Sequence, residues 1–412
     1  MATSSHTNGH TVPKFDVLII GGGIAGLTTA IACNRKGFNV TVLEATQFYT
    51  HVGAGILLSG NAAQVLIDMG LQDEMEACST HMRRVVFMTH EGKPMSIQHF
   101  PSRASSAEGG PLWQVHRADV HGLLLKKAQE VGVTIRMGVL AKSYDWDVPA
   151  AVLEDGSVIT ADVIIAADGY RSRARENLLG RQDEPRHHGY SAYRALIPGK
   201  ILAEYPDLKD LVDPKQQTSH CWVGQGRHVL GYPIRGGQDY NMVYNQPTIR
   251  AIGSKYVADV DPADIQEEYK DWDPRLVALT KHLPKDGVLE WRLCDLHPLE
   301  NWIFPGSKIV LIGDASHAML PSAAQGAAMG IEDGAAIAEL LARADSKTDV
   351  PRILRTFQNL RRNRCIDVVE NGSRDARSWH DKDDPKYKPT SNWVWVYDIK
   401  TAAREIPLSN EA

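Results

Sequence analysis

The chain has 412 residues, of which 43% are hydrophobic and 23% charged, and its formal net charge is −5. A chain of this length is expected to form two closely joined domains rather than one small core. Its basic residues are scattered and its overall charge is slightly negative, which argues against nucleic acid as a partner.

The first residues of the chain and the spacing of its cysteines indicate the cellular compartment of the protein. Residues 1–13 are polar and lack the apolar core of a secretory signal, so we expect a disordered leader. No apolar run reaches the roughly 18 residues that a membrane span needs. The five cysteines lie far apart and include no CxxC pair, which disfavours a metal site or a disulfide framework. We therefore predict a cytoplasmic protein with no membrane span and no metal.

Residues 15–45, FDVLIIGGGIAGLTTAIACNRKGFNVTVLEA, are typical of a nucleotide-binding βαβ unit. Gly21 permits a tight turn, Gly23 lets the backbone approach a pyrophosphate, and Gly26 permits close packing of the helix on the strand. Glu44 ends the second strand, where it can accept a hydrogen bond from a ribose hydroxyl. An acid at this position disfavours the 2′-phosphate of NADP. This unit alone leaves NAD and FAD open.

The chain between this unit and residue 187 contains short mixed elements. Their apolar spacing and turn residues allow each element to be assigned to a helix, a strand or a loop. The predictions are helices near 61–69, with Asn61 as the N-cap, and 117–132, strands at 85–89 and 133–137, a loop at 101–111, a hairpin at 151–160, and a buried strand at 162–169 that ends in a turn.

The pattern of apolar and polar residues changes between about residue 187 and residue 294. Short alternating segments such as SAYRALIP and RHVLGYPI predict an antiparallel sheet, interrupted by helices near 262–272 and 274–283. Further helices are predicted near 330–343 and 351–379. The sheet is therefore inserted between separated segments of a nucleotide-binding domain.

A second glycine-and-carboxylate element lies at 308–334. A buried strand ends at Gly313-Asp314, where the carboxylate can accept hydrogen bonds from a sugar-alcohol chain. Small residues around Gly326 and Ala327 let backbone N–H groups reach a flat ring, and a helix that starts there offers its positive end to an anionic ring. These features favour FAD, although an ordinary strand-to-helix crossover has the same outline.

We therefore predict an α/β protein with a GxGxxG Rossmann-type FAD domain, an inserted antiparallel-sheet substrate domain and a C-terminal helical region. The predicted boundaries are a leader at 1–13, the FAD domain at 14–80, 106–186 and 295–345, the substrate domain at 81–105 and 187–294, and the C-terminal region at 346–412.

Three motifs, in this order, resemble the class A FAD-dependent aromatic hydroxylases, the family of salicylate hydroxylase. They are the glycine fingerprint with Glu44, the segment ADVIIAADGYRSRARENL with Asp168-Gly169, and Gly313-Asp314 with the small residues at 324–327. The segments at 52–62 and 112–120 resemble the salicylate hydroxylase branch. Together the resemblance covers residues 15–345.

The resemblance implies a role for each matched residue. Glu44 would bind the adenosine ribose, Asp314 the ribityl chain, and Arg117 the region between ribityl and pyrophosphate. Asp168 would serve both FAD and NAD(P)H. The remaining implied FAD contacts are backbone of Gly55, Gly326 and Ala327.

The resemblance also implies an NAD(P)H- and O2-dependent hydroxylation of a small aromatic or polycyclic substrate through a flavin C4a-hydroperoxide. Decarboxylation or dearomatisation could accompany it, and the protein could be a monomer or a homodimer. Two alternatives stay open: an FAD-dependent epoxidase of a secondary-metabolite alkene, and a flavin-binding protein without turnover.

Candidate catalytic residues come from the predicted sheet. Alternation places His228 and Tyr232 on one face, where Tyr232 could orient a phenol and His228 could titrate. Arg194 could pair with a phenolate or carboxylate. Each also has a structural interpretation, as an exposed arginine, a packed tyrosine or a hydrogen-bonded histidine. His51 is a further candidate, and His317 is expected to brace the Gly313-Asp314 loop.

Overall fold

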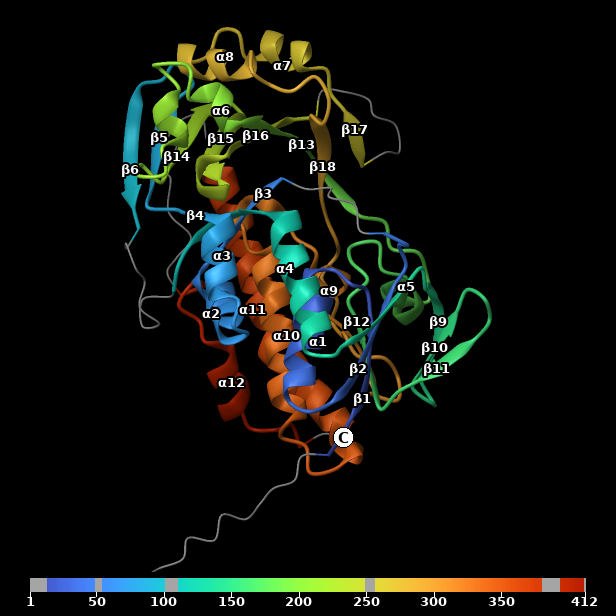
Figure 1. Ribbon diagram of the computed structural model, residues 1–412. Coiled ribbons are helices and arrows are strands. Elements are labelled where there is room, and N and C mark those ends of the chain that lie inside the picture. The colour runs from blue at the N-terminus through green and yellow to red at the C-terminus, as the bar shows by residue number, and fades with distance from the viewer. Residues whose placement is uncertain (1–12, 49–53, 101–109, 249–255, 380–392, 411–412) are drawn as a thin grey trace, which may run out of the picture.

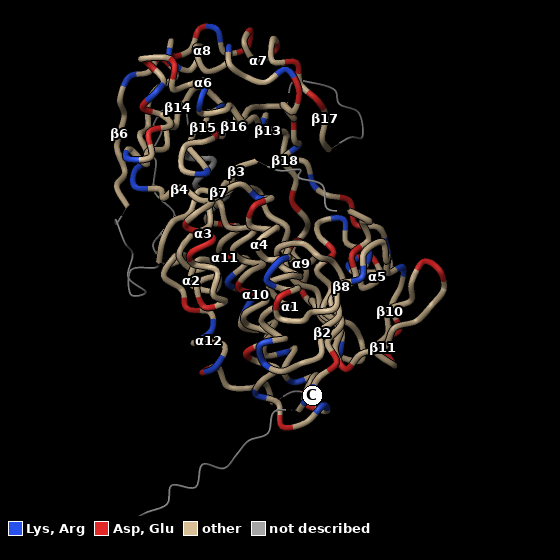
Figure 2. Tube along the Cα trace, viewed as in Figure 1, with Lys and Arg blue, Asp and Glu red and all other residues tan. Residues whose placement is uncertain are grey.

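The computed structural model in Figure 1 describes residues 13–48, 54–100, 110–248, 256–379 and 393–410. A body built from segments near both ends of the chain lies below a second body that is built on a large sheet (Figure 1). Acidic and basic residues are interspersed along both bodies (Figure 2). His51, the predicted leader except for its last residue, and most of the predicted 101–111 loop lie outside the described residues.

The lower body is organised by a parallel five-stranded sheet in the order β19-β12-β1-β2-β8. Every neighbouring pair in this sheet is parallel, as predicted for a Rossmann-type unit. Helices α1 and α10 pack closely on each other beside the sheet and bury its apolar residues. The bounds are β1 Asp16–Ile20, α1 Ile24–Arg35, β2 Asn39–Glu44, β8 Thr134–Met137, β12 Val163–Ala166, β19 Ile309–Leu311 and α10 Gly326–Leu341.

Two of the three glycines of the βαβ turn are required because neighbouring backbone segments approach them closely. A Cβ at Gly26 would lie 2.0 Å from the carbonyl oxygen of Gly21. Gly21 has a φ of +103°, and a Cβ there would lie 2.4 Å from the carbonyl oxygen of Ala167. By contrast, nothing lies within 4 Å of a Cβ built at Gly23. The first and third glycines therefore serve the fold, and the second leaves open space in front of α1.

The upper body is an eight-stranded sheet in the order β17-β18-β13-β16-β15-β14-β5-β6. Figure 1 shows that α6, α7 and α8 cover its outer side, and its other side faces the lower body. The bounds are β5 Arg84–Thr89, β6 Pro94–His99, β13 Arg186–Pro198, α6 Gly199–Leu202, β14 Thr218–Gly224, β15 Arg227–Ile234, β16 Asp239–Pro247, β17 Val257–Asp259, α7 Pro262–Glu268, α8 Pro274–Thr280 and β18 Leu289–Asp295.

Small elements complete the connections between the bodies. One three-stranded sheet, β3-β7-β4, lies under the upper body, and the predicted hairpin at 151–160 forms part of another, β11-β10-β9. The bounds are β3 Gly55–Leu58, α2 Gly60–Asp68, α3 Gln72–Cys78, β4 Ser79–His81, β7 Trp113–His116, α4 Arg117–Glu130, β9 Ala141–Asp145, β10 Ala150–Leu153, β11 Val158–Thr160, α5 Arg173–Leu179, α9 Asp314–His317, α11 Val350–Trp379 and α12 Ile399–Glu405.

The predicted α/β fold class is confirmed, with three local corrections. The upper sheet is not wholly antiparallel, because β14 pairs with β5 in parallel after a long connection. Helix α2 follows Ser59 rather than Asn61 as its N-cap, since the Asn61 side chain is used in a buried network. Helix α10 begins at Gly326, four residues before the predicted start, because the small residues there continue the helical turn.

Replacing Gly26 with alanine should disrupt the fold, because the new methyl group meets the Gly21 carbonyl. We expect the free energy of unfolding to fall by about 3 kcal/mol or more, at the upper end of overpacking effects. Gly23→Ala is the matched control, since its methyl group enters open space. Thermal denaturation of both cofactor-free variants measures the difference, and equal melting temperatures would contradict this account of the turn.

Candidate functional site

The first part of the candidate site lies where β1 and β2 end. Glu44 accepts a hydrogen bond from the backbone N–H of Gly22 at 2.8 Å and two more from Thr46 at 2.9 Å. Helix α1 begins here without a capping side chain and without an acidic residue in its first turn. Its first N–H groups and its positive end are therefore available to an anion such as a pyrophosphate.

The second part lies at the end of β19, where Gly313 is followed by Asp314. The Asp314 side chain is exposed. The surrounding protein nevertheless displaces water from it and raises its pKa, although the charges of His317 and Arg117 oppose this rise. An exposed carboxylate that is enclosed in this way lies in a recess, which suits hydrogen bonding to the hydroxyl groups of a ligand.

The third part is the start of α10, which is also uncapped. No side chain caps the helix at Gln325, and no acid lies in its first turn. Ala324 adopts the left-handed conformation, with a φ of +50°, and Gly326 and Ala327 open the helix. The side chain of Gln325 is turned into the protein instead, where it binds Ser59. Among the described residues no side chain caps the backbone donors of this first turn, so they can bind a ligand.

Arg117 lies between these parts and the upper sheet. Its side chain is exposed, and its backbone N–H donates to the carbonyl oxygen of Ala54 at 3.2 Å. Its charge acts to lower the pKa of both Asp314 and Arg194. The structure therefore brings together Arg117, Asp314 and Arg194, which come from three separate segments.

Asp168 makes its hydrogen bonds within its own turn, whereas the resemblance implied a role toward FAD and NAD(P)H. Its carboxylate accepts hydrogen bonds from the Ser172 hydroxyl at 2.5 Å and from the backbone N–H of Ala174 at 3.1 Å. Burial raises the pKa of Asp168 even though these bonds favour its charged form. Asp168 therefore holds the turn at Gly169, whose φ is +81°, against the start of α5.

Arg194 lies on the side of the upper sheet that faces the lower body. It is opposite Val243 on β16 and Leu289 on β18. With Ala54, Leu289 and Trp291 it lines a cavity of about 250 Å³. Its buried Nε has no hydrogen-bond partner in the described part of the chain, and burial lowers its pKa while Tyr232 opposes this effect. A guanidinium with an unused buried donor at the wall of a cavity can donate a hydrogen bond to a ligand, and its charge favours an anionic acceptor.

Tyr232 and Asn241 join the upper sheet to the lower body at Gly55. The two are opposite each other on β15 and β16, and the Gly55 N–H donates to Oδ1 of Asn241 at 2.7 Å. A Cβ at Gly55 would lie 2.8 Å from the Tyr232 hydroxyl. Glycine is therefore needed here because Tyr232 packs directly on the backbone, and burial raises the pKa of Tyr232. Sequence analysis missed Asn241, which no motif distinguishes.

His228 is buried on the same strand as Tyr232, and it lies opposite Asn245 on β16. Its Nε2 lies 2.8 Å from Nδ2 of Asn245. This contact gives His228 a role in packing the sheet, and its role as a titrating group stays a prediction.

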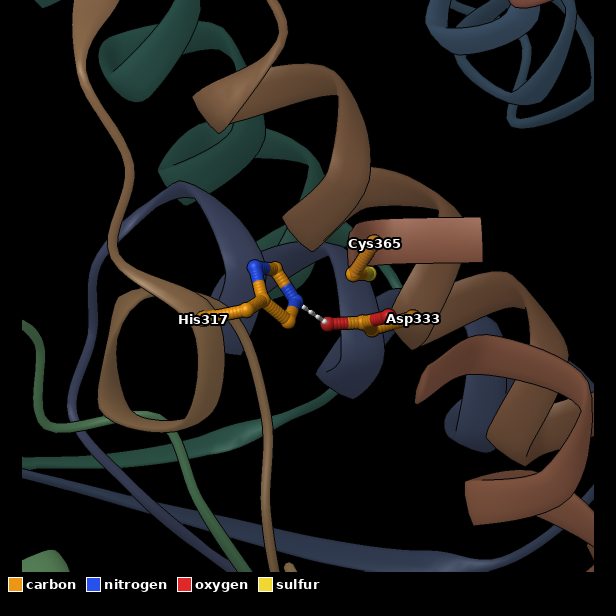
Figure 3. Close-up of side chains that lie close together, drawn as sticks. All are labelled: His317, Asp333 and Cys365. Carbon is orange, nitrogen blue, oxygen red and sulfur yellow. Dashed lines mark hydrogen bonds and ion pairs between the residues drawn. The ribbon is translucent and has the colours of Figure 1, made fainter. Parts of the chain in front are cut away.

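His317 braces the Gly313-Asp314 loop, as its sequence position suggested. Its Nε2 lies 2.7 Å from Oδ2 of Asp333, and Cys365 lies close to both (Figure 3). Arg361 also donates to Asp333 at 2.7 Å. Because a guanidinium already occupies this cluster, it is an ion-pair brace rather than a cation site.

In the described part of the chain, no helix is both long enough and apolar enough to cross a membrane.

Comparison with known proteins places these features in context. The model of the FAD binding domain family matches residues 14–372. The FAD-dependent monooxygenase OpS4 of Beauveria bassiana is 30% identical over 375 residues, which are 90% of this chain and 86% of the relative. 3-Hydroxybenzoate 6-hydroxylase 1 of Aquipseudomonas alcaligenes is 32% identical over 332 residues, 80% of this chain and 81% of the relative. A solved salicylate hydroxylase–substrate complex has a TM-score of 0.79 at 24% identity, covering 97% of this chain and 99% of that one.

Replacing Asn241 with alanine leaves the buried N–H of Gly55 without an acceptor. We expect the free energy of unfolding to fall by about 1–3 kcal/mol, the usual cost of an unsatisfied buried donor. Asn359 is exposed on α11, so Asn359→Ala is a matched control expected to change stability by less than about 0.5 kcal/mol. Urea denaturation compares the two, and an Asn241 variant as stable as the control would refute the contact's importance.

Proposed function

Because the chain belongs to the FAD binding domain family and is an FAD-dependent monooxygenase, we propose that it uses NAD(P)H and O2 to hydroxylate an aromatic or phenolic ring. The resemblance to class A aromatic hydroxylases is confirmed at the level of the family, since a 3-hydroxybenzoate hydroxylase is among its relatives. We also propose the domain boundaries that the sequence predicts, with the FAD domain at 14–80, 106–186 and 295–345 and the substrate domain at 81–105 and 187–294.

The residues of this chain fit FAD along its whole length. The open space in front of Gly23 and the uncapped start of α1 suit the pyrophosphate, and Glu44 suits the adenosine ribose. At the other end, Asp314 suits the ribityl hydroxyl groups, and the free N–H groups at Gly326 and Ala327 suit the electron-rich edge of the ring. When bound, FAD supplies the acceptance of hydride and the activation of oxygen.

The observation that carries the substrate proposal is the Nε of Arg194, which lies at the wall of the cavity without a hydrogen-bond partner among the described residues. A guanidinium there would bind a phenolate or a ring carboxylate through charge-assisted hydrogen bonds. Tyr232 stays protonated because burial raises its pKa, so its hydroxyl could donate to the same oxygen. Leu289 and Trp291 offer an apolar surface for the ring and help to exclude water.

The nicotinamide cofactor is proposed to approach beside the turn at Gly169. Arg171 follows this turn, is exposed, and lies over the ring of Tyr256 with its guanidinium carbon 4.8 Å from the ring centre. A cation held in place by an aromatic ring is suited to a phosphate of NAD(P)H. Asp168 would act here by holding the turn rather than by contacting the cofactor.

The proposal is tested with purified, FAD-loaded protein. A panel of phenols and aromatic acids is screened for stimulated oxidation of NADPH and of NADH, and the product of each positive is analysed by mass spectrometry and NMR. We expect at least one aromatic compound to stimulate oxidation and to gain one oxygen atom. Stimulation by an isoprenoid alkene alone, with an epoxide as the product, would overturn the hydroxylase assignment.

Replacing Arg194 with methionine should weaken the use of acidic aromatic substrates. We expect kcat/KM to fall by roughly 30-fold or more, since the loss of one partner from a desolvated charge pair costs at least about 2 kcal/mol. Arg194→Lys keeps the charge and should recover part of the loss. Steady-state kinetics with the best substrate of the screen measures both variants, and the flavin absorbance of each checks its folding. Equal kcat/KM for the wild-type protein and the Arg194→Met variant would rule out this role.

A further inference from the structure

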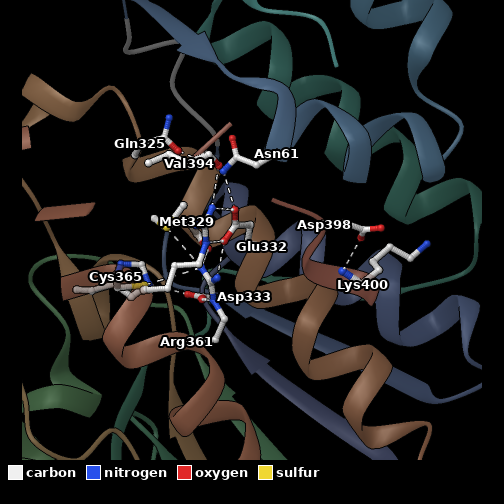
Figure 4. A network of polar contacts seen from close by, with 12 residues as sticks. Asn61, Gln325, Met329, Glu332, Asp333, Arg361, Cys365, Val394, Asp398 and Lys400 are labelled. Carbon is white, nitrogen blue, oxygen red and sulfur yellow. Dashed lines mark hydrogen bonds and ion pairs between the residues drawn. The ribbon is translucent and has the colours of Figure 1, made fainter. Parts of the chain in front are cut away.

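A buried network of charged residues lies behind the start of α10. Glu332 and Asp333 are on α10, and Arg361 is on α11 (Figure 4). Arg364 is also on α11. Arg364 donates to both oxygens of Glu332, at 2.8 and 2.7 Å. Arg361 donates to one oxygen of each carboxylate. All four side chains are at most 6% exposed, so the contacts are made out of reach of water.

The network extends to each element that is expected to surround the flavin. The N–H of Gly313 donates to Asp333 at 2.8 Å, directly before Asp314. Asn61, at the start of α2, donates to Glu332 at 2.6 Å and to Gln325 at 3.2 Å. Gln325 is the residue before Gly326. Two carboxylates of one helical turn therefore hold the second and third parts of the candidate site together.

The network also reaches the last described segment of the chain. Arg364 donates to the carbonyl oxygen of Val394 at 2.9 Å, and its guanidinium carbon lies 3.8 Å from the centre of the Tyr397 ring. Trp395, between these two residues, packs on Phe100 with 5.6 Å between ring centres. The C-terminal segment is thus connected on one side to α10 and on the other to the edge of the upper sheet.

Stability alone does not account for this arrangement. A buried ion pair contributes little net stability compared with apolar residues of the same volume, because both charges lose their water. What it does supply is a single geometry, since Glu332 uses both oxygens for four hydrogen bonds. Burial raises the pKa of Glu332, but the charges of the two arginines outweigh this and hold it below its usual value. The carboxylate is therefore ionised.

We propose that Glu332 and Arg364 are positioning residues that hold the start of α10 in place and balance the charge behind it, so that its positive end acts undiminished on the flavin ring. The inference rests on FAD binding by the proposed monooxygenase. Glu332 is six residues from Gly326, about 9 Å along the helix. At that range in a buried site, an unbalanced charge alters the stability of the anionic reduced flavin.

The sign of the effect separates charge balance from general disruption. Glu332→Gln removes a negative charge and leaves one guanidinium charge in excess, because Asp333 still balances the other, so the midpoint potential of bound FAD should rise. Arg364→Met removes a positive charge and leaves the carboxylates in excess, so the potential should fall. Arg364→Lys keeps the charge and should stay close to wild type. A merely structural role would shift the first two variants in the same direction.

The potentials are measured on FAD-loaded protein without substrate, by equilibrium with a reference dye during slow reduction. Opposite shifts for Glu332→Gln and Arg364→Met support the proposal, whereas shifts of one sign, or none, overturn it. Should either variant fail to fold with FAD, Gln325→Glu replaces it. That change is nearly isosteric. The Asn61 amide already donates to Gln325, and the Ser59 hydroxyl, which donates to Asn61 in the structure, can rotate to donate to the new carboxylate.

Gln325→Glu places a negative charge at the start of α10, so the potential should fall, and an unchanged or raised potential overturns the proposal. Failure of the proposed function is distinguishable. If wild-type protein binds FAD and these shifts appear, but no aromatic compound stimulates NAD(P)H oxidation, the substrate assignment fails and the positioning role stands. If aromatic compounds are hydroxylated without these shifts, only the positioning role fails.

Discussion

The ion pairs between α10 and α11 are the contacts on which the rest of the site depends. Glu332 and Asp333 could not be buried without partners, because an isolated carboxylate in a dry interior is strongly destabilising. Their two arginines come from a helix more than twenty residues later in the chain. Once paired, the same carboxylates accept hydrogen bonds from Gly313 and Asn61. One set of contacts thereby aligns three segments that are far apart in the sequence.

A second constraint shapes the cavity at which we propose that a substrate binds. The upper sheet meets the lower body at Gly55, where Asn241 accepts a backbone hydrogen bond and Tyr232 packs on the glycine. Arg194 lies on the same side of the sheet, at the wall of a cavity that also includes Ala54. The cavity therefore has walls from both bodies. A site at such a joint can be closed to water by both, which oxygen activation on a flavin requires.

Much of the fold and one end of the site could be predicted from local sequence. The βαβ unit, the hairpin at 151–160 and the long C-terminal helix follow from apolar periodicity and turn residues, which act over a few neighbouring positions. The parallel pairing of β14 with β5 could not be predicted, because strand order depends on contacts between distant segments. The role of Asn61 could not be predicted either. Its place before a helical pattern suggests an N-cap, but its side chain donates to Glu332 on α10 instead.

The residues of each segment are enough to predict the chemistry that the segment can offer: glycines where backbones approach closely, carboxylates after strands, and a run of small residues before α10. These depend on the conformational freedom and donor or acceptor groups of single residues, which are the same wherever the segment lies. Which of these groups act together depends on how the segments pack in the folded chain. This packing placed the charge of Arg117 near both Asp314 and Arg194, gave Asp168 the role of holding the Gly169 turn against the start of α5, and set Tyr232 on Gly55. Distance, burial and the loss of water arise only when segments meet, so no segment carries that information alone.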